Sequence, residues 1–302
     1  MISTNIVTAT RALFNSLTDA SVYKPYNWPF KRIFVVKSIR ELGPRQEAPY
    51  GQSLSPTTGD AVRVACEQQK WPLQSQLLSP GASYADATLH EIKIESSSSP
   101  PSRKRALLFF HGGGYRAAMA RAGHMLACHS YAKTLEASHL IVLEYSLSPG
   151  QTYPTQLAQA ISSLAKLIVD FDFKPEEIVL AGDSAGGTLV FALLAHLIQP
   201  HPGCSVIPQM QGKQLKAALC ISPWVTMKYN SASCQENEEI DMLTKERMEL
   251  FTKSFKPSEG HVWADMLTGD MSLWSQIPVK HILLTAGALE ILGKMWLLWT
   301  QD

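Results

Sequence analysis

The sequence has few cysteines, and none of them stands at a metal-binding or redox spacing. The five cysteines are odd in number, widely spaced and form no C-x-x-C pair: Cys66, Cys128, Cys204, Cys220 and Cys234. Such a set predicts neither a disulfide framework nor a zinc site. We therefore expect a protein of a reducing compartment that binds no metal.

The sequence also lacks an excess of charge of either sign. Lys and Arg number 27 while Asp and Glu number 26, which leaves a net charge of +1. This balance argues against a nucleic-acid-binding protein, a polybasic membrane module and an acidic tail.

Long hydrophobic runs are missing as well. The most apolar stretches, around 188–198 and 281–299, carry His, Glu or Lys and fall short of a clean span of ~20 residues. The first twenty residues lack the apolar region of a signal peptide, and the last three are not a peroxisomal signal. We expect no membrane span and a cytoplasmic location.

What the sequence does contain is typical of a folded α/β protein. Short, continuous apolar runs recur along the chain, as in strands that are buried on both faces. These runs are 106–110, 140–143, 178–181, 217–221 and 282–285. Apolar residues at helical spacing fill 157–168 and 189–197 between them. The alternation predicts a parallel sheet covered by helices on both faces.

Two regions depart from this alternation, and we interpret them as a cap over the active edge of the sheet. Residues 1–85 hold scattered aromatics and prolines, and residues 224–275 combine an acidic stretch with an amphipathic helix. Ordinary flanking helices are the alternative. The predicted organisation of 1–302 is a single domain, with its core in 86–223 and 276–302.

The strongest chemical motif is the run Gly182-Asp183-Ser184-Ala185-Gly186-Gly187. It satisfies G-x-S-x-G directly after a predicted strand and before a predicted helix, which is the setting of a nucleophile elbow. Glycines two residues before and after the serine permit a sharp turn. We predict that Ser184 is a nucleophile.

A second motif, His111-Gly112-Gly113-Gly114, follows the strand at 106–110. Consecutive glycines leave backbone N–H groups unhindered, and such groups stabilise an oxyanion. We expect Gly112, Gly113 and Ala185 to donate these hydrogen bonds, with His111 positioning the loop. A phosphate-binding loop is the alternative, but the lysine and the glycine spacing of such loops are missing.

Together, the two motifs resemble those of the hormone-sensitive-lipase-like carboxylesterases of the α/β-hydrolase superfamily. The resemblance runs from about residue 107 to 292 and includes Ile221-Ser222-Pro223-Trp224 and the stretch 145–154. It implies the α/β-hydrolase fold, with an eight-stranded, mainly parallel sheet and a helical cap. The general texture is most similar to fungal members that process secondary metabolites.

The same resemblance implies that Glu290, in Gly287-Ala288-Leu289-Glu290-Ile291-Leu292, is the catalytic acid. Asp183 is an alternative acid but is expected to brace the elbow, and Asp265 and Asp270 are weaker candidates. The family's histidine would follow the acid, yet residues 291–302 contain none. None of His124, His129, His196, His261 and His281 is well placed to replace it.

From these features we expect a chain truncated before the family's last strand and helix. The apolar stretch 295–299 would then be exposed unless a partner, such as a second copy in a homodimer, covers it. The predicted function is a serine hydrolase of small or medium apolar esters, without a cofactor. The alternatives are a binding protein on the same scaffold, as in the plant gibberellin receptors, and a truncated gene product.

Overall fold

A seven-stranded, mostly parallel sheet organises the computed structural model, which describes residues 20–41, 57–94, 104–120 and 123–293 together with Thr10 and Phe14. The strand order is β1-β2-β4-β3-β5-β6-β7. Only the pairs β1–β2 and β2–β4 are antiparallel. The strands are β1 (Leu73–Leu78), β2 (Ala87–Lys93), β3 (Ala106–Phe110), β4 (His139–Glu144), β5 (Ile178–Asp183), β6 (Ala217–Ile221) and β7 (Ile282–Thr285).

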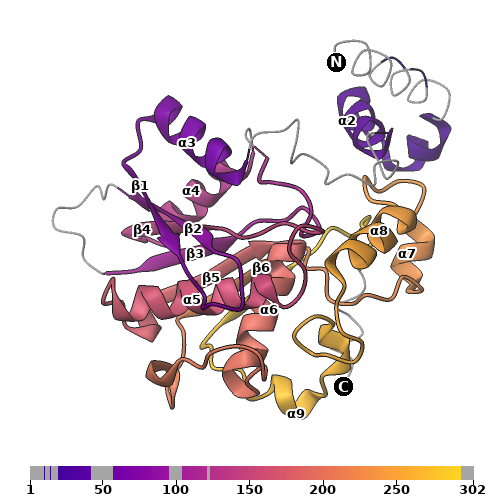
Figure 1. Ribbon diagram of the computed structural model, residues 1–302. Coiled ribbons are helices and arrows are strands. Elements are labelled where there is room, and N and C mark those ends of the chain that lie inside the picture. Colours follow the sequence, from indigo (N-terminus) through magenta and orange to yellow (C-terminus); the bar gives the residue numbers. More distant parts are fainter. Residues whose placement is uncertain are drawn as a thin grey trace.

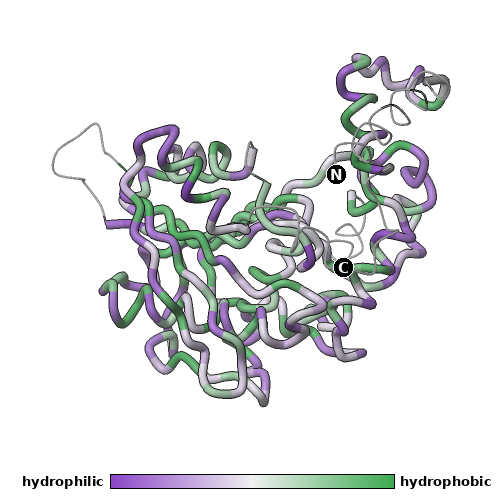
Figure 2. The backbone as a smooth tube through the Cα atoms, turned by 45° about the horizontal axis from the view of Figure 1, so that its top comes forward, coloured by the Kyte–Doolittle hydropathy of each residue, from purple (hydrophilic) through white to green (hydrophobic). Residues whose placement is uncertain are grey.

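Helices cover both faces of this sheet (Figure 1). One face carries α3 (Thr58–Gln69) and α4 (His124–Thr134), and the other carries α5 (Thr155–Val169) and α6 (Ala185–Ile198). Every residue of β3 is buried, as its continuous apolar sequence predicts. Figure 2 shows hydrophobic residues running along the strands and the helices against them, so the core is a sandwich of three layers.

A separate group of helices, which we call the cap group, lies beyond the carboxyl ends of the strands (Figure 1). It consists of α2 (Phe30–Glu41), α7 (Ala232–Asn237) and α8 (Lys245–Phe255), with η1 (Ala20–Tyr26) before α2. The remaining short elements are η2 (Pro175–Glu177), η3 (Pro208–Met210), η4 (Met266–Thr268) and α9 (Met271–Trp274).

Two arginines dock α2 onto the segment that joins α7 to α8. Arg40 Nη1 donates to the carbonyls of Glu238 and Asp241, at 2.8 and 2.5 Å. Arg247 Nη2 donates in return to the carbonyls of Ile39 and Arg40, at 2.6 and 3.1 Å. The carbonyls of Ile39 and Arg40 lie in the last turn of α2, so the Arg247 guanidinium also satisfies groups that the helix leaves unpaired.

The predicted boundary at residue 85 needs correction. Residues 57–85 contain α3, which packs on the sheet, and β1, which is its first strand, so they belong to the core. The stretch 295–299 lies outside the described residues. In the described part of the chain, no helix combines the length and the apolar character that crossing a membrane requires.

Candidate active site

Ser184 stands on a strained turn between β5 and α6. Its φ of 51° and ψ of −120° are rare for a residue with a side chain. The turn also depends on Gly186, because a Cβ there would lie 2.0 Å from the carbonyl oxygen of Phe110. Ser184 N donates to Ile221 O at 2.9 Å, which ties the turn to the end of β6. The structure thus places Ser184 where the motif predicts it.

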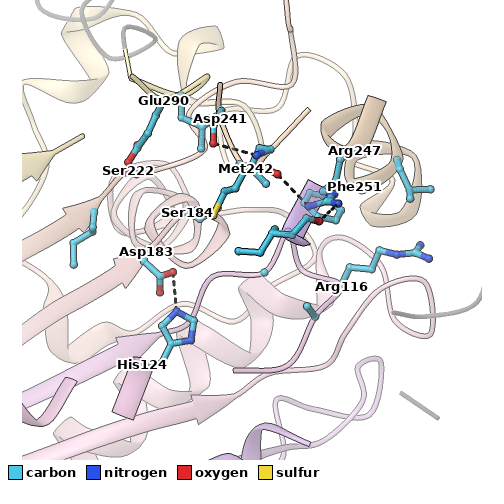
Figure 3. Close-up of a pocket in the computed structure, with 18 residues that line it drawn as sticks. Arg116, His124, Asp183, Ser184, Ser222, Asp241, Met242, Arg247, Phe251 and Glu290 are labelled. Atoms are coloured by element: carbon cyan, nitrogen blue, oxygen red, sulfur yellow. Dashed lines mark hydrogen bonds and ion pairs between the residues drawn. The ribbon is translucent and has the colours of Figure 1, made fainter. Parts of the chain in front are cut away.

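A cavity of about 570 Å³ opens above Ser184 (Figure 3). Its apolar wall comes largely from the cap group of helices and the loops beside it, and includes Ile39, Met242, Leu243, Leu250, Phe251 and Leu292. Its charged lining residues are Arg116, His124, Asp183, Asp241, Arg247 and Glu290. An apolar pocket with a few converging polar groups is the usual form of a small-molecule site.

The glycine loop after β3 borders this cavity, but its three amides are not equivalent. Gly112 N donates to Asp183 Oδ1 at 2.8 Å. The prediction that Gly112 offers a free oxyanion donor is therefore wrong, because Asp183 already takes that N–H. Gly113 and Gly114 line the cavity instead, with φ of 119° and 63°. Among the described residues their N–H groups have no hydrogen-bond acceptor.

The third amide at this edge belongs to Ala185, the first residue of α6. The N–H groups in the first turn of a helix have no intrahelical partner and carry the positive end of the helix dipole. Gly113, Gly114 and Ala185 therefore present donors close to the Ser184 hydroxyl.

Helix α8 packs directly against the glycine loop. A Cβ on Gly114 would lie 2.3 Å from Cδ2 of Phe251, so the aromatic ring rests on the glycine backbone. The next residue, Tyr115, stacks on Phe255 with ring centroids 4.2 Å apart. Arg116 Nη1 donates to Ser254 Oγ at 2.5 Å. The position of the loop is thus coupled to the position of α8.

His111, expected to position the loop, is held by Thr58 and Tyr145. Its Nε2 lies 3.0 Å from Thr58 Oγ1, and its ring stacks on Tyr145 with centroids 4.3 Å apart. The Tyr145 hydroxyl donates to the His111 carbonyl at 2.6 Å. Burial lowers the pKa of His111 to about 4, so the ring is neutral near pH 7.

Asp183 braces the elbow, and His124 is its partner. His124 Nε2 lies 3.2 Å from Asp183 Oδ2, while His124 Nδ1 accepts the Ala120 N–H at 3.1 Å. Burial opposes both charges, but the mutual hydrogen bond outweighs it: the pKa of His124 is raised and that of Asp183 is lowered. His124 was not singled out for this role, because nothing in its sequence setting points to Asp183.

Glu290 lies in the loop after β7 and lines the cavity. Three buried side chains of the α7 region bind the backbone of this loop. Ser233 Oγ donates to Ile291 O at 2.7 Å, Asn237 Nδ2 donates to Glu290 O at 2.9 Å, and Asp241 Oδ2 accepts from Ile291 N at 2.6 Å. The acidic stretch before residue 241 was the only sequence signal for this contact.

Asp241 also contributes to the electrostatics of the cavity. Burial raises the pKa of Asp241, and the negative charge of Glu290 adds to the effect. The loop amides of Ile291 and Leu243 oppose this shift by donating to the carboxylate.

All nine histidines of the chain lie in the described residues, and none is hydrogen-bonded to Ser184. Only His124 lines the cavity, and both of its ring nitrogens are engaged. His196 binds Ser205 O at 3.0 Å and His261 binds the Tyr153 hydroxyl at 3.1 Å. In the described ranges, no cluster of three or more His, Cys, Asp or Glu side chains could hold a metal ion.

The chain belongs to the alpha/beta hydrolase fold family, whose sequence pattern it matches over residues 107–292. No curated protein sequence matches it. The solved structures that it resembles include a carboxyl esterase from Tuber melanosporum, with a TM-score of 0.60 and 17% identity, covering 74% of this chain and 68% of that one. An esterase from Pyrobaculum calidifontis has a TM-score of 0.62 and 19% identity, and the match covers 80% of this chain and 74% of that one.

A bacterial esterase of the hormone-sensitive lipase family has a TM-score of 0.59 and 24% identity, with 88% of this chain and 80% of that one covered. At identities of 17–24%, the likeness to these solved structures shows the fold alone. The fold is the one that the two sequence motifs imply.

The His124–Asp183 pair predicts how stability changes with pH. A raised histidine pKa stabilises the folded state below the unfolded pKa of about 6.5, and this contribution is lost as pH rises through the folded pKa. A lowered aspartate pKa stabilises the folded state above the unfolded pKa of about 3.9, and this contribution is lost as pH falls through the folded pKa. The pair thus contributes most between these two limits.

We therefore expect the gap in unfolding free energy between wild type and His124→Gln to be largest near pH 5–6 and to shrink toward pH 9, as measured by urea titration. His129→Gln is the matched control, because His129 lies on the same helix and stacks on Trp71 at 3.8 Å. A gap for His124→Gln that grows with pH would contradict the ion pair.

Proposed function

We propose that the protein is a carboxylic-ester hydrolase with Ser184 as its nucleophile. The observation that carries this proposal is that a strained serine and two glycines with unpaired N–H groups line one apolar cavity, with the first amide of α6 directly after the serine. The Ser184 oxygen attacks the ester carbonyl carbon, and the carbonyl oxygen becomes an oxyanion. Gly113, Gly114 and Ala185 then donate their N–H groups to that oxygen.

Collapse of this intermediate breaks the bond to the alcohol, which leaves with a proton, and an acyl group remains on Ser184. Water attacks the acyl-enzyme in the same way and releases the acid. Glu290 is the proposed acid, whose carboxylate orients and stabilises a protonated base during each step.

The cavity supports small or medium apolar esters as substrates. Its volume of about 570 Å³ falls within the range of about 300–1,000 Å³ that drug-sized ligands occupy. Met242, Leu250 and Phe251 offer apolar surface for the acyl or alcohol group. A role in secondary metabolism, a cytoplasmic location and a homodimer stay predictions from the sequence.

Further support comes from the proteins of similar fold, which include esterases from a fungus, an archaeon and bacteria. One observation favours a second candidate, a protein that binds an apolar ligand without hydrolysing it. None of the nine histidines, all of which lie in the described residues, is hydrogen-bonded to Ser184.

The Ser184→Ala variant tests the nucleophile. We expect wild type to react with a fluorophosphonate probe and to hydrolyse p-nitrophenyl butyrate slowly, because the oxyanion donors alone retain about 10³–10⁴-fold of catalysis over water. Ser184→Ala should lose both the labelling and the hydrolysis. Wild type that binds the ester but neither reacts nor hydrolyses it would support the binding protein instead.

Ser75→Ala is a demanding control for this experiment. The Ser75 hydroxyl lies 2.8 Å from His90 Nδ1, and His90 Nε2 lies 3.0 Å from Glu144 Oε2. This serine has a histidine and a carboxylate but stands on edge strand β1, away from the cavity. Labelling should therefore persist in Ser75→Ala, and its loss there would overturn the assignment to Ser184.

The contact between Gly114 and Phe251 gives a second prediction. A Cβ on Gly114 collides with the ring, so we expect Gly114→Ala to displace the donor loop from α8, and losing one oxyanion donor costs about 10²–10³ in kcat. Phe251→Ala removes the obstacle, and the double variant should recover most of the loss. The left-handed alanine itself costs about 1–2 kcal/mol of folding stability in both variants, which does not enter kcat.

The readout is kcat for p-nitrophenyl butyrate in a double-mutant cycle, with circular dichroism to verify folding. Gly123→Ala is the matched control, because a Cβ there meets nothing within 4 Å. Equal kcat values for Gly114→Ala and the double variant would show that α8 does not position the donor loop.

A further inference from the structure

Ser222 is a second strained serine that lines the cavity. Its φ of 43° lies in the left-handed region, which residues with a side chain rarely adopt. Pro223 follows directly, and the residue before a proline favours an extended backbone. Glycine would adopt this φ without a steric cost, and the left-handed Lys70 and Lys256 owe theirs to helix ends. Because such strain clusters at functional sites, the Ser222 side chain is a candidate for a role in the chemistry.

The loop that carries Ser222 is bound directly to the nucleophile elbow. Ser184 N donates to Ile221 O at 2.9 Å, and Trp224 N donates to Ser184 O at 3.2 Å. Thr188 Oγ1 on the following helix donates to Trp224 O at 2.7 Å. The backbone of Ser184 is thus held at both its nitrogen and its oxygen by residues on either side of Ser222, which fixes the two serines relative to each other.

The Ser222 backbone is also anchored on its other side, whereas its hydroxyl is not engaged. Ser222 N donates to Thr285 O, at the end of β7, at 2.6 Å. The residue is half-buried, and its hydroxyl has no hydrogen-bond partner among the described residues. Figure 3 shows Ser184 and Ser222 at the same cavity. The hydroxyl of Ser222 is therefore free to bind a ligand that occupies the cavity.

The strand order decides on which side of Ser184 this hydroxyl lies. Strand β5, which ends beside Ser184, stands between β3 and β6. The glycine loop follows β3, and Ser222 follows β6, at the level where Asp183 pairs with Ile221. Adjacent strands lie about 4.8 Å apart. The glycine donors and the Ser222 hydroxyl therefore flank Ser184 on opposite sides.

The chemistry of the tetrahedral intermediate indicates what a donor on the β6 side would bind. The central carbon carries three oxygens: Ser184 Oγ, the oxyanion and the alkoxy oxygen of the alcohol. The oxyanion faces the glycine loop and the first amide of α6, so the alkoxy oxygen remains for a donor on the other side. It gains negative charge as its bond to carbon breaks. A hydrogen bond there is stronger in the transition state than in the bound ester, which is the requirement for catalysis.

We propose that Ser222 is a further catalytic residue, whose hydroxyl donates a hydrogen bond to the alkoxy oxygen of the ester as the alcohol leaves. The inference rests on the proposed function. The Ser222 proton stays on its own oxygen, so the hydrogen bond adds no covalent step to the reaction. During hydrolysis of the acyl-enzyme, the oxygen of the attacking water takes the position of the alkoxy oxygen, and Ser222 contacts it in the same way.

A comparison of two butyrate esters in the Ser222→Ala variant tests this role. Ethoxide keeps its developing charge on one oxygen, whereas p-nitrophenoxide spreads the charge over its ring and needs the hydrogen bond less. We expect kcat/KM to fall by about tenfold or more for ethyl butyrate and by less than about threefold for p-nitrophenyl butyrate. A change that only disturbs the structure of the elbow would lower both values by the same factor.

Two further variants separate the hydroxyl from the strained backbone. Ser222→Gly also removes the hydroxyl but relieves the strain, so it should show the same ester-dependent loss as Ser222→Ala, with a higher urea midpoint. Ser275→Ala is the matched control, because the exposed Ser275 hydroxyl donates to Ser272 O at 3.0 Å outside the cavity. Its kcat/KM values should equal those of wild type. Circular dichroism verifies that each variant folds.

Boron acids provide a measurement that does not depend on turnover. Ser184 Oγ adds to the boron of butylboronic acid, its proton leaves to solvent, and the tetrahedral adduct carries two further oxygens. One occupies the oxyanion position and the other the alkoxy position. In butyl(methyl)borinic acid a methyl group replaces the second oxygen. Ser222→Ala should weaken binding of the boronic acid by about tenfold and that of the borinic acid by less than about twofold, as measured by calorimetry.

The outcomes separate this proposal from the proposed function. Equal losses of kcat/KM for the two esters, equal losses of affinity for the two boron acids, or no loss in Ser222→Ala would overturn the role of Ser222 and leave the esterase standing. Wild type that neither labels with fluorophosphonate nor hydrolyses either ester would overturn both.

Discussion

The carboxylate of Asp183 holds together the two loops on which the site depends. It belongs to the end of β5, beside Ser184, and its Oδ1 accepts the Gly112 N–H from the loop after β3. Its Oδ2 meets His124 at the start of α4. Hydrogen bonds to charged groups contribute about 1.5–3 kcal/mol each. One half-buried carboxylate thus fixes the glycine loop against the elbow.

This arrangement explains why the first amide of the glycine loop, that of Gly112, is not available as an oxyanion donor. A Cβ on Gly112 would lie 2.2 Å from Asp183 Oδ2, so the carboxylate approaches the bare backbone. With Gly112 committed to structure, Gly113 and Gly114 remain to face the cavity. The cap group of helices completes the site, because Phe251 rests on Gly114 while Asn237 and Asp241 bind the Glu290 loop.

Most of the sheet could be predicted because its strands are buried on both faces. The apolar runs at β3, β6 and β7 gave their exact bounds, whereas β1 was missed. Strand β1, Leu-Gln-Ser-Gln-Leu-Leu, lies at the edge of the sheet, half of its residues are exposed, and its sequence has no long continuous apolar run. Without that strand, residues 57–85 could not be recognised as part of the core.

The residues of the site also fall into those that the sequence predicted and those that it did not. The motifs located Ser184 and the glycine loop, because the chemistry demands those residues in consecutive positions. The hydrogen bonds of Gly112, His124 and Asp241 depend on side chains that only the folded chain brings together. Asp241 belongs to the acidic stretch that was assigned to the cap as a whole, and its burial against the Glu290 loop appears only in the fold.

A crystal structure of the chain after reaction with a phosphonate ester tests the central claim most directly, because the phosphonyl oxygen occupies the position of the oxyanion. The account predicts phosphorus bonded to Ser184 Oγ, with that oxygen about 3 Å from the backbone nitrogens of Gly113, Gly114 and Ala185. Gly112 N should still donate to Asp183. An oxygen bound by Gly112 N, or directed away from the glycine loop, would contradict the account.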